Sequence, residues 1–321
     1  MENKIKKNNV ALFFRHTVPF TVGHYVHQCL KQTSDNVEVF LPAQAKYLPA
    51  GSHDLYVCID DGTHYIFPQS LKPSAVWLID THTGYLARLI MARQFDYVFA
   101  SCKNGTQKLL RDGISNPYWL PLACDPVFHG KTEHPKKFDV AFIGSSGWGR
   151  RKRLVQKICK RFSNSYIGSA NYEDIGTIYS QAKIVFNCGI IHDLNMRLFE
   201  GLCSGSCVVT NSDTFGLSDF FRNKEHLVTY DTDAGVISLI AYYLLHDDER
   251  EKIALAGRKE VLASHTYHHR VQEMLKIICN SQQAPHKAKH RHLLLCWVDR
   301  LKLWLIEFAY KIRYRLIRKI R

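Results

Sequence analysis

The stretch at residues 182–211 constrains the fold of this chain more than any other part of the sequence. It opens with a short run of β-branched and apolar residues at 183–188, as in a buried strand of a parallel sheet. After a loop at 189–194, apolar residues recur at helical spacing over 195–203, and Gly205 fits the left-handed position that ends a helix. A second buried strand is expected at 207–210. The order strand, loop, helix, turn, strand is typical of a doubly wound α/β sheet.

Polar groups gather at the start of the predicted helix. Asn195 can cap it, and Arg197 lies in its first turn, where free backbone N–H groups also favour an anion such as a phosphate. Glu200 follows inside the helix, just before a run of small residues. We therefore expect a site for a phosphate-bearing ligand in front of this helix.

The same residues carry a family resemblance. The run NMRLFEGLCSGSCVVTN at 195–211 is similar to the nucleotide-sugar site of GT-B glycosyltransferases, in particular the CgeB-like branch of the family-four-type retaining enzymes. The resemblance extends over about residues 75–280 and implies that Glu200 holds the ribose hydroxyls of the sugar nucleotide. The family has a second Glu eight residues earlier, at the donor sugar, but this chain has His192 there, with Asp193 beside it.

The rest of the chain predicts two domains. A length of 321 residues exceeds the usual size of one hydrophobic core. Short apolar runs, at 10–14, 37–41, 55–59, 75–79, 97–100 and 118–122, predict a first parallel sheet. A polar interval at 130–137 has the composition of a linker, and the pattern then restarts with a strand at 139–144, a helix at 151–161 and a strand at 166–167. A strand at 227–230 and helices at 236–245, 249–264 and 267–279 complete it.

We therefore expect an α/β protein of the GT-B plan, with two Rossmann-like doubly wound domains at residues 1–130 and 131–280. A basic amphipathic tail is expected at 281–321. The resemblance implies that the first domain takes the acceptor and the second the nucleotide sugar. It also implies that one of the last helices returns to the first domain.

A glycine-rich turn, FIGSSGWGRRKRL at 142–154, follows the first strand after the linker. The glycines, among them Gly144, do not form G-x-G-x-x-G, so the sequence lacks a dinucleotide fingerprint. The turn leads into a basic helix start, and Arg150 or Arg151 suits a diphosphate. The residues alone do not choose between these arginines, and a solvated basic turn is the alternative interpretation.

A second polar loop, WLIDTHTG at 77–84, follows a predicted strand and so falls at the carboxyl edge of the first sheet. Its W-x-x-D-x-H pattern is similar to that of CgeB-like chains. The resemblance implies that His82, with Asp80, acts at the donor sugar or the acceptor hydroxyl. The simpler interpretation is a capping Asp and a surface His.

The sequence predicts no metal site and no cofactor besides the donor itself. Asp231-Thr232-Asp233 matches the D-x-D that binds a metal in GT-A enzymes, but it precedes the predicted helix at 236–245 and favours a helix-capping role. His265, His268 and His269 lack carboxylate or thiol partners at suitable spacing. The resemblance implies that arginines and a helix N-terminus neutralise the leaving diphosphate.

Much of the net charge of +14 belongs to the tail. Residues 281–321 contain eleven Lys or Arg against Asp299 and Glu307, or +9. Within 291–321, apolar residues from Leu294 to Leu316 form one helical stripe, flanked by Trp297 and Trp304. This predicts a helix lying on an anionic membrane surface, with packing on the protein's own second domain or another subunit as the alternative. No nucleic-acid module accompanies the charge, so a nucleic-acid partner is not expected.

The chain shows no secretory signal, no apolar run of about 18 residues, and ten scattered cysteines without a C-x-x-C pair. We expect a cytoplasmic protein, peripheral on the inner face of the cytoplasmic membrane. The expected function is a retaining glycosyltransferase that moves a sugar from a nucleotide diphosphate donor to a membrane-associated glycan or lipid, such as a lipopolysaccharide. The alternative, favoured by His192, is a non-catalytic nucleotide-sugar-binding or envelope- or spore-assembly protein of the same fold.

Overall fold

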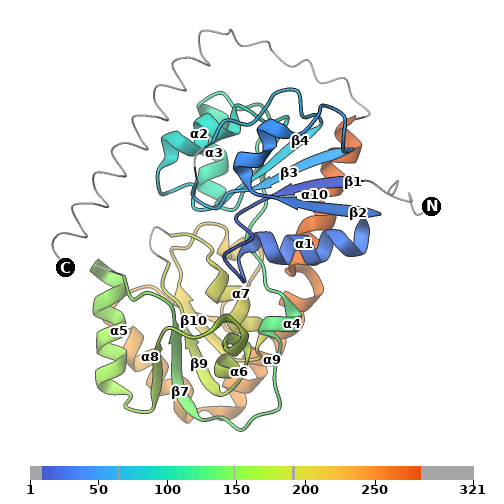
Figure 1. Cartoon of the computed structure of the whole chain (residues 1–321). Helices are drawn as coiled ribbons and strands as arrows, with labels where there is room; N and C mark the ends of the chain where they lie inside the picture. The colour runs from blue at the N-terminus through green and yellow to red at the C-terminus, as the bar shows by residue number, and fades with distance from the viewer. Residues whose placement is uncertain (1–8, 64, 148, 190–191, 283–321) are drawn as a thin grey trace, which may run out of the picture. The chain divides into compact units, whose positions relative to one another are not determined.

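The computed structural model describes residues 9–63, 65–147, 149–189 and 192–282. The chain divides into two compact units, each built around one parallel sheet covered by helices (Figure 1). Among the described residues, the first unit comprises residues 9–120 together with residues 273–282, and the second comprises Pro121–Gln272. The predicted fold class, two Rossmann-like α/β halves, is confirmed.

The first unit contains a six-stranded sheet in the order β2-β1-β3-β4-β5-β6. Its strands are β1 (Asn9–Phe13), β2 (Asn36–Phe40), β3 (Leu55–Ile59), β4 (Ser74–Leu78), β5 (Tyr97–Ala100) and β6 (Tyr118–Trp119). The α-helices are α1 (Val22–Thr33), α2 (Tyr85–Ala92), α3 (Lys103–Arg111) and the end of α10 (Tyr267–Gln282), and a 3-10 helix spans Pro42–Tyr47. All neighbouring strands are parallel.

The second unit contains a five-stranded sheet in the order β11-β10-β9-β7-β8. Its strands are β7 (Phe138–Ile143), β8 (Ser165–Gly168), β9 (Ala182–Phe186), β10 (Cys207–Asn211) and β11 (Val228–Tyr230). The α-helices are α4 (Pro126–His129), α5 (Gly149–Arg161), α6 (Ile175–Ser180), α7 (Met196–Cys203), α8 (Val236–Leu245), α9 (Asp247–Ser264) and the start of α10, with short 3-10 helices at Tyr172–Asp174 and Leu217–Asp219. From β7 the chain crosses to β8 on one side, and then builds β9, β10 and β11 on the other. The strand order therefore reverses between β7 and β9.

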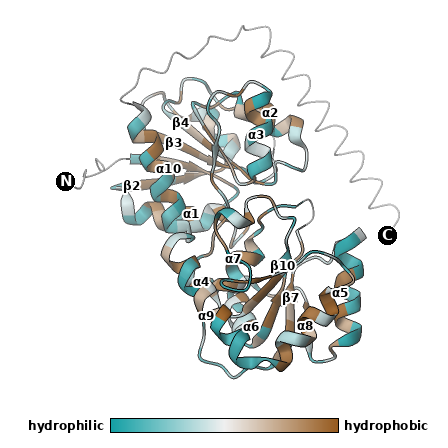
Figure 2. Ribbon diagram, turned by 180° about the vertical axis from the view of Figure 1, so that it is seen from behind, coloured by the Kyte–Doolittle hydropathy of each residue, from teal (hydrophilic) through white to brown (hydrophobic). Residues whose placement is uncertain are grey.

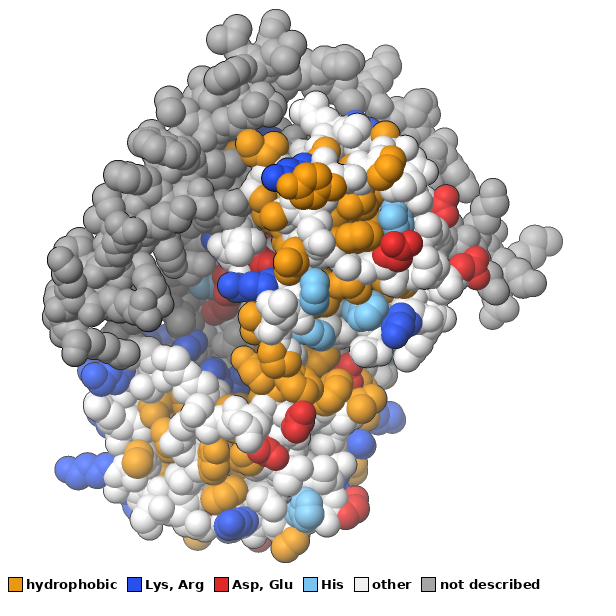
Figure 3. Space-filling model, viewed as in Figure 1, with side chains coloured by type: hydrophobic (Ala, Val, Ile, Leu, Met, Phe, Trp, Pro, Cys, Tyr) orange, Lys and Arg blue, Asp and Glu red, His pale blue; other side chains and the backbone are white. Residues whose placement is uncertain are grey.

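Apolar strands between amphipathic helices form the core of each unit. Figure 2 shows mostly hydrophobic strands and helices that carry hydrophilic residues on their outer sides. In the second unit, Leu154 and Ile158 of α5 pack in the same buried cluster as Val140 of β7 and Ile240 of α8. On the face of the molecule shown in Figure 3, Lys and Arg side chains lie scattered among apolar and neutral ones.

Helix α7 packs closely against its sheet because Gly201 has no side chain. A Cβ atom there would lie 2.9 Å from Val185 Cγ1 of β9 and 2.9 Å from Val208 Cγ2 of β10. Gly205, just past the helix, has a φ of +74°, which confirms its predicted left-handed position. This packing fixes the distance of α7 from the ends of β9 and β10.

The unit boundary lies ten residues earlier than predicted. Residues 121–130 belong to the second unit, because Cys124 forms a β-bridge with Thr266 and Arg270 Nε donates to the carbonyl of Pro121 at 2.9 Å. The polar composition of 130–137 identified a connection, but the contacts place the division before it. Residues 273–282, the end of α10, belong to the first unit, as the resemblance implied.

The predicted amphipathic tail lies outside the described residues. Among the helices that the structure describes, none is long and apolar enough to cross a bilayer. The nine cysteines within the described ranges are all free thiols.

Candidate nucleotide-sugar site

The candidate site of the second unit lies at the carboxyl ends of β7 and β9. Doubly wound sheets bind ligands where the strand order reverses, because the loops that follow the two strands run to opposite sides there. The loop after β7 contains Gly144, and the loop after β9 begins with Asn187 and Cys188. Most of the predicted phosphate-binding residues belong to these loops or to the helices that follow them.

Arg197 extends from the first turn of α7 to the ends of both strands. Its Nε donates to the carbonyl of Ile143 at 2.9 Å and its Nη1 to Asn187 Oδ1 at 3.1 Å. The guanidinium also lies over the ring of Phe142, 4.2 Å from its centroid. Gly144 leaves room for it, since a Cβ there would lie 2.7 Å from Arg197 Nη2 and the φ of +123° disfavours other residues. Arg197 is therefore held rigidly at this position.

Arg151 reaches the same place from α5. Its Nε donates to the carbonyl of Cys188 at 2.8 Å and its Nη1 to that of Ser145 at 3.4 Å. Burial, and then the nearby charge of Arg197, lower the pKa of Arg151. Among the described residues, neither Arg151 nor Arg197 forms an ion pair with a carboxylate. Two guanidinium groups that no described carboxylate pairs with thus lie at the same edge of the sheet.

Arg150 has a different environment. Its Nε lies 2.6 Å from Asp233 Oδ1 and its Nη1 lies 3.3 Å from Asp213 Oδ2. Because two carboxylates hold this guanidinium, of the two candidate arginines Arg151 suits a diphosphate better. The predicted capping role of Asp231 or Asp233 is wrong, since Gly235 is the N-cap residue of α8 and no side chain caps the helix.

Glu200 lies on α7 and is only 7% exposed. Burial raises its pKa to about 7, although the charge of Arg197 acts in the opposite direction. His129, from α4, places its Nε2 3.7 Å from Glu200 Oε1. Above a pH of about 7 this carboxyl group is ionised. In that form both of its oxygens can accept hydrogen bonds from hydroxyl groups.

The loop before α7 contains the other predicted residues. His192 has a φ of +53°, and its Nδ1 lies 3.1 Å from both the carbonyl oxygen and Oδ2 of Asp213. Asp193 Oδ1 and both side-chain polar atoms of Asn195 are buried without a hydrogen-bond partner in the described part of the chain. Asn195 occupies the N-cap position, but its side chain makes no capping hydrogen bond, so this part of the prediction is wrong. These unpaired polar atoms remain able to bind a ligand.

Asp213 contacts both His192, in the loop before α7, and Arg150, at the start of α5. Burial alone would raise its pKa, but a hydrogen bond from Asn211 and the neighbouring charges of His192 and Arg150 outweigh burial and lower it. The ionised Asp213 therefore connects the loop of His192 to the start of α5.

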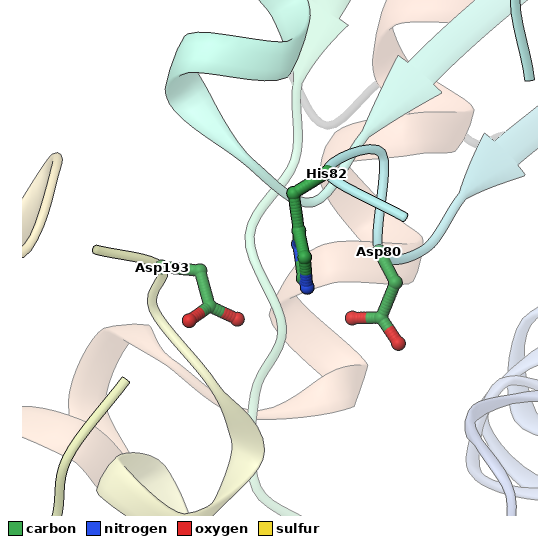
Figure 4. A group of neighbouring side chains, drawn as sticks. All are labelled: Asp80, His82 and Asp193. Atoms are coloured by element: carbon green, nitrogen blue, oxygen red, sulfur yellow. The ribbon is translucent and has the colours of Figure 1, made fainter. Parts of the chain in front are cut away.

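In the first unit, the polar loop after β4 contains His82 and Asp80, whose side chains leave the loop in the same direction (Figure 4). Asp193, of the second unit, is drawn in the same figure. Asp80 has a φ of +52° and begins a turn in which Thr83 N donates to its carbonyl at 2.8 Å. His82 Nδ1 is buried and has no hydrogen-bond partner within the described ranges.

A buried ion pair holds this loop. Arg88 Nε of α2 lies 2.9 Å from Asp60 Oδ2, after β3. The other oxygen of Asp60 accepts a hydrogen bond from Gly62 N, and Oδ2 also accepts one from Ile79 N at 3.2 Å. Arg88 Nη1 donates to the carbonyl of Thr83 at 2.9 Å. Both ends of the loop are thus fixed to one buried pair.

The sequence analysis did not identify Asp60, Arg88, His129 or Asp213. The sequence contains one usable signal for His129, because Asp125 followed by Pro126 marks the start of a helix, and Asp125 Oδ1 does accept from Val127 N at 2.8 Å. The contacts of these residues with Arg88, His192, Arg150 and Glu200 join positions 21 to 71 residues apart, and no local pattern predicts them.

Residues 127–276 match the family model described as "Glycosyl transferase-like". The two-unit structure resembles HepE of Anabaena in complex with UDP-glucose, with a TM-score of 0.60 and 10% identity over 85% of this chain and 100% of that one. It also resembles sucrose-phosphate synthase of Thermosynechococcus elongatus, with a TM-score of 0.57 and 11% identity over 87% and 100% of the two chains. The fold is GT-B.

A third similar structure is TarM of S. aureus, in a complex that includes UDP, with a TM-score of 0.55 and 11% identity. The match covers 73% of this chain but only 57% of TarM. No curated protein matches the sequence significantly. The family-model match begins within α4, covers the site residues of the second unit, and starts later than residue 75, where the resemblance was expected to start.

Proposed function

We propose that this chain is a glycosyltransferase that binds a sugar nucleoside diphosphate in its second unit. Arg151 and Arg197 bind the diphosphate, Gly144 lets it approach the backbone, and Glu200 accepts hydrogen bonds from the ribose hydroxyls. The main support is a pair of guanidinium groups that form no ion pair with any described carboxylate, at the point where the strand order of a doubly wound sheet reverses. The GT-B fold and the "Glycosyl transferase-like" match support the same assignment.

In this proposal the protein's own residues stabilise the leaving group. When the bond between the sugar carbon and the diphosphate oxygen breaks, the electron pair stays on the diphosphate, and fixed guanidinium donors stabilise that charge. Arg197 is suited to this role because its hydrogen bonds to Ile143 and Asn187 fix it before the ligand arrives. The proposal needs no metal ion or further cofactor.

The remaining roles belong to the loops. As the new glycosidic bond forms, the acceptor hydroxyl gives its proton to an oxygen of the departing diphosphate, and we assign His82 and Asp80 to the acceptor or donor-sugar side. His192 and Asp193 take the place of the family's donor-sugar Glu, and Asn195 offers both amide atoms. We propose a retaining outcome and a CgeB-like relationship on the residues that resemble that branch.

We further propose that the acceptor is a membrane-associated glycan or lipid, of the cell-envelope or lipopolysaccharide kind, and that the protein acts at the inner face of the cytoplasmic membrane. The support is the basic, tryptophan-containing sequence of residues 291–321.

The alternative proposal, a non-catalytic nucleotide-sugar-binding protein, rests on His192. Its imidazole contacts Asp213. It also replaces the carboxylate that the resembling enzymes have at this position. Incubating the protein with UDP-glucose and a lipid extract, and measuring released UDP, separates the two. The transferase proposal predicts acceptor-dependent release that is lost in Arg197→Ala. Binding of UDP-glucose without any release, tested across several nucleotide sugars, would contradict it.

A further inference from the structure

His129 lies at the end of α4 and contacts the carboxyl group assigned to the ribose. Its side chain is fully buried, at 0% exposure, and α4 packs against α7. The ring nitrogen Nε2 lies 3.7 Å from Glu200 Oε1. Sequence motifs assign no role to this histidine.

The other ring nitrogen identifies the tautomer. His129 Nδ1 lies 3.0 Å from the backbone N of Asp125, and a backbone N–H can only donate, so Nδ1 accepts and carries no proton. Burial lowers the pKa of His129 to about 4, so the ring is neutral at pH 7. Its one proton must then be on Nε2, the atom that faces Glu200.

We infer that His129 is a positioning residue, whose Nε2–H donates to Glu200 and holds the carboxylate ionised and oriented for the ribose hydroxyls. The 3.7 Å separation is longer than an ordinary hydrogen bond, and such contacts often shorten when ligand binds. The ribose part of this inference rests on the proposed function. The contact between the two side chains does not.

Among the described residues, Arg197, Tyr179 and His129 lie near the carboxyl of Glu200. Arg197 lies one turn earlier on α7, but its side chain donates hydrogen bonds to Ile143 and Asn187. Tyr179, from α6, is buried, and burial raises its pKa far above neutrality, so it carries no charge. His129 is the group from α4. Helix α9 also packs on α7, through Arg258 and the carbonyl of Cys203 at the other end of the helix.

Removing the hydrogen bond from His129 should raise the pKa of Glu200, because a hydrogen bond to the charged form lowers a carboxyl pKa. Without the donor, Glu200 should ionise at higher pH. Since the carboxylate is the form that accepts from hydroxyl groups, UDP affinity should then need a higher pH to reach its full value.

The test uses a matched pair of variants in the full-length protein, with UDP as the probe. In His129→Asn, the amide oxygen can still accept from Asp125 N, but no donor reaches Glu200. In His129→Gln, the longer side chain places an N–H near the position of Nε2. We expect the Asn variant to raise the pH midpoint of UDP affinity by about one unit and to weaken binding about fivefold at pH 7, with little change at pH 9. The Gln variant should restore the midpoint.

A loss of affinity that is equal at all pH values, or an unchanged midpoint in a folded Asn variant, would overturn the inference. Because a buried substitution can prevent folding, ¹⁵N-histidine NMR of the unsubstituted protein provides a second test. We expect His129 to be protonated at Nε2, with a resonance that shifts near pH 7 and no longer does so in Glu200→Gln. Protonation at Nδ1 would refute the contact, whatever UDP does. If Glu200→Gln left UDP affinity unchanged, that result would instead refute the proposed function.

Discussion

Arg150 and Arg151 are neighbours in the sequence and equally basic, yet their side chains have different partners. Arg150 pairs with Asp213 and Asp233, whereas Arg151 bonds only to carbonyl oxygens among the contacts of the described residues. The sequence could not distinguish them, because the two carboxylates come from positions 63 and 83 residues away. Because Asp213 and Asp233 pair with Arg150, Arg151 is the arginine that remains available to an anion.

This difference predicts different effects of two single substitutions. Arg151→Ala should weaken UDP binding about tenfold to a hundredfold, since a hydrogen bond to a charged group contributes about 1.5–3 kcal/mol. Binding of uridine, which lacks phosphate, should change much less. Arg150→Ala should affect UDP less than Arg151→Ala does. Calorimetric titration with UDP and uridine measures both. Equal losses for the two ligands in Arg151→Ala would mean that Arg151 only supports the local structure.

Glu200 predicts a dependence on pH. Glu200→Gln should weaken UDP binding about tenfold or more at pH 9, because an amide is a poorer acceptor for two hydroxyl groups than a carboxylate. The affinity of the unsubstituted protein should rise with pH through about 7, where Glu200 ionises, and that of the variant should not. Titrations between pH 6 and pH 9 measure this. An affinity that Glu200→Gln leaves within about twofold would exclude Glu200 as the ribose ligand.

The same shift affects stability in the opposite direction. The pKa of Glu200 is raised in the folded state, so the protonated form stabilises the fold, and that contribution is lost as pH rises from about 4.5 to about 7. Denaturant unfolding at pH 5 and pH 8 should show a loss of up to about 3 kcal/mol from this group in the unsubstituted protein and not in Glu200→Gln. A variant with the same pH dependence as the parent would contradict the raised pKa.

At the scale of elements, hydropathy predicted the long and regular parts. The strand at Leu55–Ile59 and the helix at Val236–Leu245 have the predicted bounds, and the other predicted strands are within a few residues. The short helices α4 and α6 were not predicted, because four to six residues do not complete two helical turns of apolar spacing. Tertiary contacts with α7 stabilise them instead.

The contact of α7 with its sheet gives the prediction at this scale. Gly201→Ala should destabilise the second unit by about 1–3 kcal/mol, because the new Cβ would lie 2.9 Å from side chains of both β9 and β10. Gly168→Ala is the matched control, since nothing lies within 4 Å of the position of its Cβ. Denaturant unfolding of both variants measures the difference. Equal stability of the two would mean that α7 shifts freely on the sheet.

For the whole molecule, the sequence predicted the two-unit α/β plan but placed the boundary by composition. Residues 121–130 resemble the end of the first domain, yet the bridge of Cys124 to Thr266 and the contact of His129 with Glu200 make them part of the second unit. A linker is recognised by its polarity, whereas the division of a chain depends on contacts between residues far apart. The same limit kept His129 out of the predicted site.

The tail gives the last prediction, which depends on sequence alone because residues 283–321 lie outside the described part. Deleting 291–321 should leave a folded protein, since every described element of both units ends by Gln282. The full-length chain should bind vesicles that contain anionic lipid, through its Lys and Arg side chains and its apolar stripe, and the truncated chain should not. Binding should weaken as salt screens the charges. Cosedimentation with anionic and neutral vesicles at low and high salt measures this.

The competing arrangement, in which the stripe from Leu294 to Leu316 is buried against the protein, makes the opposite prediction. Truncation would then expose apolar surface, so the shortened chain should aggregate or unfold at a much lower temperature. The intact chain should not bind vesicles. Thermal unfolding of both chains, followed beside the cosedimentation, separates the two arrangements. Since deletion should leave UDP affinity unchanged if the tail serves only the membrane, titration of the truncated chain with UDP shows in addition whether the tail belongs to the donor site.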